Sequence, residues 1–368
     1  MTGVQTCALT ISMQRIRFFD IAKGIAILCV ILSHSAIEAQ FVVPSHFAKL
    51  IVSVCFSFHM PLFFILSGYF MHPERDFRWA KEARQLLCTY LLTGVAVLLG
   101  VTCVATIDHG SRRDALRQWG KAVFYGSGDI SELTLWPVDC RIGAIWFLLA
   151  LFWAHLLLHV FAKLPQTPIW VAGCFALGYV SARYIWLPWS LQSGMCAVAF
   201  LYIGYLAKQH DVLGLMQRFH WLWLAAGVVW IVDIAFFGGM SMAMNDYGTK
   251  PVLAVVGSLA GTLCLVGISE CIDKVPVVGS ALSLAGRSSL AILCVHLIED
   301  DVLPWQMILV SFHEVLPQVP LTCTAFVMRL PLDLLLAAAL YYVPVINEWF
   351  YPQLAKKQLG RKAVVDKA

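Results

Sequence analysis

The apolar stretch FFDIAKGIAILCVILSHSA, residues 18–36, carries three ionisable side chains, Asp20, Lys23 and His34. Its length suits a membrane-spanning helix, and an ionisable group in hydrocarbon costs about 2.5–3.5 kcal/mol on insertion scales. Groups that remain inside a span despite this cost usually have a function. The segment therefore indicates both a membrane fold and the neighbourhood of a site.

Lys23 and His34 lie on one side of this predicted helix. They are eleven residues apart, which at about 100° and about 1.5 Å per residue leaves roughly 20° between them around the axis and roughly 16 Å along it. Asp20, three residues before Lys23, shares that side. This layout suits a long anionic molecule held near the membrane surface, with proton chemistry deeper in the membrane.

The whole chain has the composition of a membrane protein. Of its 368 residues, 60% are hydrophobic and 13% are charged, whereas a soluble domain has about 25% charged residues. Apolar runs of about 20 residues recur. We predict an all-α, polytopic integral membrane bundle of about ten transmembrane helices. Their ranges are roughly 18–38, 50–71, 86–107, 143–161, 168–186, 190–208, 220–238, 250–270, 281–300 and 321–346.

The distribution of Lys and Arg predicts the orientation of the chain. With the N-terminus in the cytoplasm, seventeen of these residues fall on the inner side and eight on the outer side, and Arg329 lies within a span. This excess predicts a multi-pass protein of the cell membrane with both termini cytoplasmic. No basic cluster is interleaved with exposed aromatic residues, so we expect no nucleic-acid partner. The sequence leaves homo-oligomerisation open.

The chain is expected to form one membrane domain, residues 13–350, followed by a cytoplasmic basic tail, residues 351–368. Residues 1–12 look like a non-native addition and are left out of the fold prediction. Twelve cysteines occur without a single CxxC spacing, and most lie inside predicted spans. They are interpreted as small apolar residues, with neither a disulfide framework nor a bound metal.

Four motifs, in order along the chain, resemble the acyltransferase-3 family of integral membrane acyltransferases, in particular its fucose 4-O-acetylase-like subgroup. The first motif is Asp20, Lys23 with Gly24, and His34, where many members have Arg in place of Lys23. The others are SFHMPLFFILSGYF at 57–70, AIWFLLALF at 144–152 and LAILCVHL at 290–297.

This resemblance implies a function and a set of partners. It implies an acyl-CoA donor, most simply acetyl-CoA, reached from the cytoplasm, and a hydroxyl acceptor on a cell-surface glycan or glycolipid reached from the other side of the bilayer. It also implies that His34 is essential. Acyl-CoA is then a substrate, and no permanently bound cofactor is expected.

His34 is the expected catalytic residue, as a general base or as a nucleophile that carries the acyl group. The alternative is a histidine that only packs between helices. His59 begins the second span on the outer side, either in the site or as an interfacial residue. Asp233, Glu299 and Asp333 are equal candidates for the carboxylate that orients the imidazole.

The donor is expected to meet the cations of the inner side. Lys23 is a candidate phosphate contact, or only a snorkelling lysine. Arg78 and Arg84 belong to the densest basic run, which also serves as a topology signal, and Arg84 is best placed at the helix mouth. Asp20 would orient Lys23 or join the donor site.

The acceptor is expected to meet residues of the outer half. His296 and Trp146 stand in family motifs, and Glu299 follows His296 in an acidic stretch expected to be solvated. Arg329 is either an acceptor contact or the partner of Asp333 in an ion pair within one helix. His155 and His159 have metal-like spacing but no Glu nearby in the sequence, so we interpret them as packing residues.

Two functions other than an enzyme compete with this prediction. One is a transporter or exporter of a polar solute or glycan, whose intramembrane charges would line its path. Its usual sign, a pair of matched interrupted helices in two related halves, is missing. The other is a membrane anchor or sensory module, for which replacing His34 would be harmless.

Overall fold

The computed structural model describes residues 16–352. The predicted non-native segment 1–12 lies outside this range, and so does the basic tail beyond Pro352. Within the described range the chain is helical and forms no sheet, with only two isolated bridges, Thr134–Trp186 and Ser241–Asp246. The predicted all-α class is confirmed.

The helices of the first half are α1 (Arg17–Val42), α2 (His46–Phe56), α3 (His59–Tyr69), α4 (Trp79–Glu82), the π-helical turn η1 (Ala83–Cys88), α5 (Thr89–Ile107), α6 (Arg112–Tyr125), the 3₁₀ turn η2 (Gly143–Ile145), α7 (Trp146–Phe161) and α8 (Thr167–Ser181). Those of the second half are α9 (Leu191–Gln209), α10 (Val212–Arg218), α11 (Trp221–Ala235), α12 (Pro251–Asp273), α13 (Pro276–Arg287), α14 (Ser289–Val302), α15 (Trp305–Val315), α16 (Leu321–Tyr342) and α17 (Asn347–Phe350).

Six of these segments are long and apolar enough to cross a membrane: α1, α2 with α3, α4 through α5, η2 with α7, α12 and α16. The number is eight if two bent pairs each form one span, α10 with α11 at 108° and α13 with α14 at 68°. The prediction of about ten spans is therefore not confirmed. The predicted span 168–186 corresponds to α8, which has only 15 residues. The predicted span 190–208 corresponds to α9, which has polar residues at both ends.

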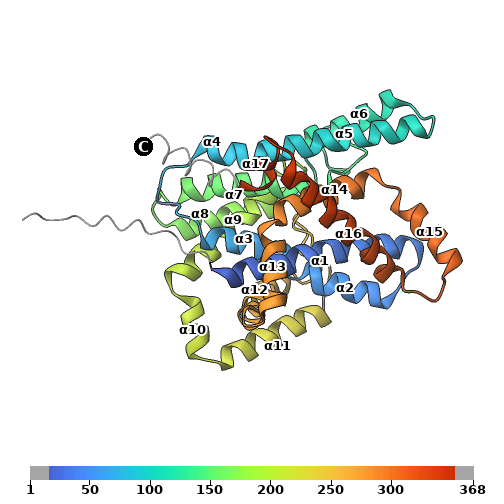
Figure 1. The fold of residues 1–368 in the computed structure, drawn as a ribbon. Coiled ribbons are helices and arrows are strands. Elements are labelled where there is room, and N and C mark those ends of the chain that lie inside the picture. Colours follow the sequence, from blue (N-terminus) through green and yellow to red (C-terminus); the bar gives the residue numbers. More distant parts are fainter. Residues whose placement is uncertain (1–15, 353–368) are drawn as a thin grey trace, which may run out of the picture.

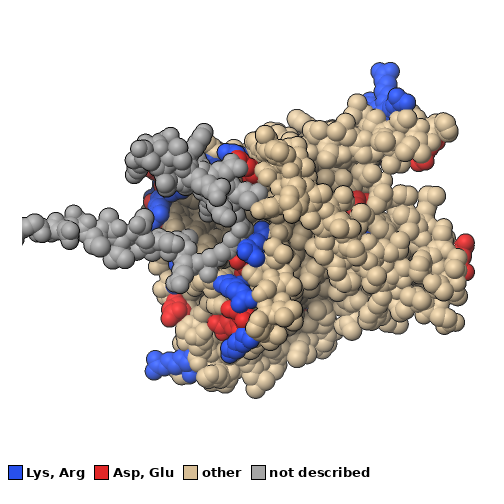
Figure 2. Space-filling model, viewed as in Figure 1, with Lys and Arg blue, Asp and Glu red and all other residues tan. Residues whose placement is uncertain are grey.

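Charged side chains on the visible face gather mostly at the two ends of the molecule, and a largely uncharged belt lies between them (Figure 2). This distribution fits helices that cross a bilayer, because a charge in the hydrocarbon layer is costly. One end contains the beginning of α1, α4 and α10, and the other contains α15 (Figure 1).

Helix α1 lies in the middle of the bundle, against α2, α3, α12, α13 and α16 (Figure 1). Its approach to α13 depends on two glycines. A Cβ on Gly24 would lie 2.1 Å from the carbonyl oxygen of Leu282, and a Cβ on Gly286 would lie 1.8 Å from that of Asp20. Only small residues permit such contact between membrane helices. The glycine of the first motif therefore fixes the helix that carries Lys23 and His34.

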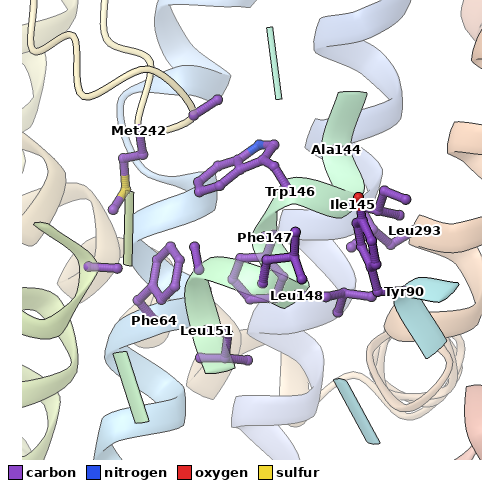
Figure 3. Packing of buried hydrophobic residues seen from close by; sticks show 14 of the residues in the cluster. Phe64, Tyr90, Ala144, Ile145, Trp146, Phe147, Leu148, Leu151, Met242 and Leu293 are labelled. Carbon is purple, nitrogen blue, oxygen red and sulfur yellow. The ribbon is translucent and has the colours of Figure 1, made fainter. Parts of the chain in front are cut away.

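Helix α7 forms the centre of the largest hydrophobic core. Phe64 of α3 packs against Phe147, with 4.8 Å between ring centroids, and against Trp146, at 6.3 Å. Leu148, Tyr90 and Leu293 fill the other side of α7 (Figure 3). This packing holds α7 between α3 and α14 and fixes the position of Trp146.

Candidate active site

Two cavities adjoin inside the bundle. The first, of about 660 Å³, is called here the basic cavity, and its charged and polar lining includes Lys23, Ser67, Arg75, Arg78, Lys81, Glu82 and His155. The second, of about 490 Å³, is called the histidine cavity, and its lining includes His34, Glu38, His59, Arg141, Trp146 and Gln306. Met60 lines both. On α1, Ile27 lines the first and Val30 the second, so one helical turn separates the two cavities.

His34 opens into the histidine cavity and is backed by a chain of buried polar groups. Its Nδ1 lies 3.3 Å from Nε2 of His296, and Nδ1 of His296 lies 3.0 Å from Oδ2 of Asp333. His296 and Asp333 are fully buried, whereas the side chain of His34 is 15% exposed. The other ring nitrogen of His34 is therefore the one available for chemistry in the cavity.

The tautomers of His34 and His296 follow from the carboxylates that contact His296. Nδ1 of His296 faces Asp333 and also Oε1 of Glu299, at 2.9 Å. A ring nitrogen between two carboxylates carries a proton and donates it to them. Asp333, the terminal acceptor, thereby fixes the ring of His296, and His296 fixes the ring of His34. The structure thus brings His34, His296, Glu299 and Asp333 together from α1, α14 and α16.

Arg329 supplies the positive charge of this cluster. Its Nη2 lies 2.7 Å from Oε1 of Glu299 and also contacts Asp300, and its guanidinium lies 5.1 Å from the ring of Trp305. Trp305 donates a further hydrogen bond to Glu299. The cluster is fully buried, where an unpaired charge would be costly. Arg329 therefore holds the acids of α14 in place.

One of the two alternatives for Arg329, and the expectation of a solvated acidic stretch, were wrong. Arg329 does not pair with Asp333 within α16, because Glu299 and Asp300 of α14 reach the guanidinium and His296 takes Asp333. The acidic stretch after His296 is not solvated: Glu299 is 3% exposed and the side chain of Asp300 is 2% exposed. Helix α14 packs against α16 and bends by 68° from α13, which places its last turn inside the protein.

Asp233 does not lie beside His34 or His59. It lies on α11, which packs against α12 at the lower edge of the bundle in Figure 1, and its side chain sits where a Cβ on Gly257 would be. Its Oδ2 is buried without a hydrogen-bond partner among the described residues. Helix α12 contacts both α11 and α1, so Asp233 lies on the outer layer of the bundle and not beside His34.

His59 and Trp146 line the same cavity as His34. Nδ1 of His59 lies 2.5 Å from the carbonyl oxygen of Cys55, one turn earlier, and so donates to it. Its ring packs on Phe56, with centroids 4.9 Å apart. His59 is thus tied to its own segment, and it forms part of the cavity wall.

The residues predicted to bind the acyl donor divide into those that line the basic cavity and those that do not. Lys23 and Arg78 line the basic cavity, and Nζ of Lys23 lies 5.7 Å from the ring centroid of Phe70. Arg84 does not line it: its guanidinium contacts Glu348 at 2.5 Å and the ring of Trp349 at 5.3 Å, which ties η1 to α17. Asp20 is buried beside α13.

Sequence reasoning missed Asp300 and Arg141. Oδ2 of Asp300 lies 3.8 Å from Nδ1 of His34 and 3.7 Å from Arg141. Neither residue stands in a motif, and the contact between segments 141 and 300 arises only in the folded protein. The position of Asp300, directly after Glu299, was the one available signal.

The donor set of His296, Glu299 and Asp333 has distances that a metal ion could use, since its ligand atoms lie within 4.8 Å of one another. Arg329 is already in contact with the Glu299 oxygen that faces His296. The guanidinium therefore occupies the place that a metal ion would take. A site without metal stays our prediction.

The helices, the largely uncharged belt and the buried polar cluster define a multi-pass membrane protein with an internal site. A family model, the acyltransferase domain of the acyltransferase-3 family, matches residues 16–346, and the chain therefore belongs to that family. Neither a curated protein nor a solved structure gave a match. The chain is thus a membrane acyltransferase, and family membership favours this function over transport.

Proposed function

We propose that this protein is an O-acetyltransferase of the fucose 4-O-acetylase-like subgroup. It moves an acetyl group from cytoplasmic acetyl-CoA to a hydroxyl of a cell-surface glycan or lipid-linked sugar. The observation that carries the proposal is the series of contacts from Asp333 through His296 to His34. His34, at the end of this series, lines a cavity. A base held by a second histidine and a buried carboxylate suits the deprotonation of a hydroxyl.

The basic cavity is the proposed entrance of the donor. Coenzyme A is a polyanion, and four cations line this cavity, Lys23, Arg75, Arg78 and Lys81. Cations gather on the cytoplasmic side of membrane proteins, which supports the orientation predicted from the sequence. Both ends of the described chain fit this orientation, because α1 begins at this end and α17 packs against η1.

The donor's pantetheine arm would pass Met60, where the cavities adjoin, and bring the thioester to His34. The acceptor would enter the histidine cavity from the opposite end, past Arg141 and Trp146. His34 takes the proton of the acceptor hydroxyl as its oxygen attacks the thioester carbonyl carbon. The carbon–sulfur bond then breaks, and the proton passes from His34 to the leaving thiolate.

His296 and Asp300 support this step from behind His34. Asp300 lies 3.8 Å from Nδ1 of His34, close enough to favour the imidazolium that forms as the proton moves. His296 keeps the ring in one orientation because Asp333 holds its own Nδ1. A direct transfer and an acetyl-His34 intermediate use the same contacts.

The experiment uses the full chain in nanodiscs with radiolabelled acetyl-CoA and a panel of sugars and lipid-linked sugars. His34→Ala should lower transfer of label about 10²–10⁴-fold, the range of general-base catalysis. His46→Ala, an exposed histidine at the start of α2 and outside both cavities, is the matched control. Equal transfer by wild type and His34→Ala, with equal thermal melting, would remove His34 from the reaction.

A further inference from the structure

A second constellation lies in the basic cavity, away from His34. Oγ of Ser67, on α3, lies 2.8 Å from Nε2 of His155, on α7. Nδ1 of the same ring lies 2.9 Å from Oε2 of Glu82, at the end of α4. All three line the cavity. Nucleophile, base and orienting carboxylate therefore stand in the order found in serine-dependent acyl transfer.

The distances assign a role to each group. A carboxylate at Nδ1 fixes the tautomer in which this nitrogen carries the proton, which leaves Nε2 free to accept the hydroxyl proton of Ser67. Glu82 is kept as a carboxylate by Lys81, whose Nζ lies 3.5 Å from its other oxygen. His155 and Glu82 are each 15% exposed, so the pair is shielded yet open to the cavity.

Local structure distinguishes the segments that carry Ser67 and Glu82. A Cβ on Gly68, next to Ser67, would lie 1.9 Å from the carbonyl oxygen of Leu201, and a Cβ on Gly204 would lie 2.0 Å from that of Ile65. Helices α3 and α9 thus meet through paired glycines and cannot slide past each other. Glu82 directly precedes the π-helical turn η1, and such turns are frequent at functional sites.

We propose that Ser67, His155 and Glu82 form a catalytic triad that cleaves an acyl thioester in the basic cavity and takes the acyl group onto Ser67. The ligand class is a thioester on a phosphorylated carrier, since cations line the same cavity. The inference rests on the proposed thioester donor but not on the role of His34. It gives His155 a role other than the packing role expected from the sequence, because Glu82 is far in sequence and near in space.

The step is balanced without a further reactant. His155 takes the proton of Ser67 as Oγ attacks the thioester carbonyl carbon, the carbon–sulfur bond breaks, and His155 gives the proton to the leaving thiolate. The products are a free thiol and an acyl-Ser67 ester. Water or an alcohol then attacks the ester, with His155 taking its proton and returning a proton to Ser67.

The triad lies on the donor's side of Met60. Ser67 follows Met60 by seven residues, which is about 10 Å along α3 and almost the same side of the helix. A thioester would therefore meet Ser67 before it reaches His34. The protein would contain two separate groups able to act on one donor, each in its own cavity.

The first test needs no knowledge of the donor. A fluorophosphonate probe should label wild type in nanodiscs, with the adduct on Ser67 by peptide mass spectrometry, and Ser67→Ala should lose the label. Ser53→Ala is the matched control, because Ser53 lies on the same predicted span and its hydroxyl donates to the carbonyl of Lys49 one turn earlier. An unlabelled Ser67 in folded wild type overturns the triad.

The second test measures the acyl step without an acceptor. Acetyl-CoA, and the small thioester acetyl-N-acetylcysteamine as a donor without phosphates, are mixed with protein, and thiol release and acid-quenched protein mass are followed. Ser67→Ala should lose the acetyl adduct, and His155→Asn should release thiol about 100-fold more slowly. Ser67→Cys should regain an adduct, which guards against a folding defect. Thiol release by Ser67→Ala equal to that of wild type overturns the proposal.

His34→Ala separates this inference from the proposed function. It should still form acetyl-Ser67 while transferring acetyl groups to a sugar about 10²–10⁴-fold more slowly than wild type. Loss of transfer in His34→Ala with Ser67 never acylated in wild type would leave the proposed function standing and refute the triad. Acylated Ser67 in wild type, together with normal transfer by His34→Ala, would support the triad and refute the proposed role of His34.

Discussion

The basic cavity takes its cations largely from one exposed segment, Arg75, Arg78 and Lys81, whereas the histidine cavity rests on buried charges of α14 and α16. Exposed side chains keep many rotamers and adapt to a flexible anion, but each contributes little to the free energy of binding. Buried charges are held in one arrangement because every alternative leaves one of them unpaired. The basic cavity should therefore govern the affinity for the donor. The histidine cavity should govern the rate of transfer and the stability of the fold.

The largest effect is expected at Arg329. Arg329→Met removes the guanidinium that holds Glu299 and Asp300 together, and leaves these buried carboxylates with His296 and Arg141 as partners. Breaking a buried pair in this way costs about 3–5 kcal/mol. Thermal or denaturant unfolding in nanodiscs measures it, with Arg183→Met, an exposed arginine on the ring of Tyr179, as control. Unchanged unfolding would show that the cluster carries no stability.

The next effect is expected at Asp333. Asp333→Asn keeps the shape of the side chain but removes one of the two carboxylate charges at Nδ1 of His296. Acetyl transfer to the acceptor should fall about 100-fold, because the ring behind His34 loses one of the two carboxylates that hold its orientation and proton. Donor affinity should stay the same, since Asp333 lies outside the basic cavity. A variant that transfers normally but binds the donor weakly would reverse the assignment of the two cavities.

A smaller effect is expected where the cavities adjoin. Met60→Trp places a rigid ring at the wall that both cavities share. Transfer to the acceptor should fall at least about tenfold, whereas donor binding should change by less than about twofold, because on the proposed route the phosphates bind on the basic side. Equilibrium binding and turnover are compared, with Met60→Leu as the control of similar volume. Equal losses in both quantities would argue against passage of the thioester beside Met60.

The smallest effect is expected at Lys23. Lys23→Ala should weaken acetyl-CoA binding about five- to tenfold, and Lys23→Arg should restore most of it, because the contact depends on charge. The loss should shrink as salt is raised, since ions screen exposed charges. Equal affinities of the Ala and Arg variants at low salt would show that Lys23 does not touch the anion.

Local patterns predicted much of this molecule. Helical phase placed Lys23 and His34 on one side of α1, and each now lines a cavity. The motif containing His296 predicted a site residue, but its contact with His34 joins positions 262 residues apart and no spacing encodes it. Helix propensity and hydropathy therefore predict the elements, whereas the site arises from packing between them.

The errors have the same origin. Spacing of four residues favoured a pair between Arg329 and Asp333, yet partners on α14 compete for both side chains once the helices pack. The isolated acid Asp233 looked equivalent to Asp333, and only the order of helices around α1 separates them. Local arguments fail wherever two partners are available and the tertiary structure chooses.

The single turn of α1 between Ile27 and Val30 has a consequence for energetics. With water in both cavities, most of the transmembrane voltage would fall across the thin septum between them, about 2.3 kcal/mol per elementary charge at 100 mV. On the proposed route only the neutral thioester end of the donor crosses this septum, while the phosphates stay behind. Acetyl export would then proceed without electrical work and at the same rate in energised and depolarised membranes.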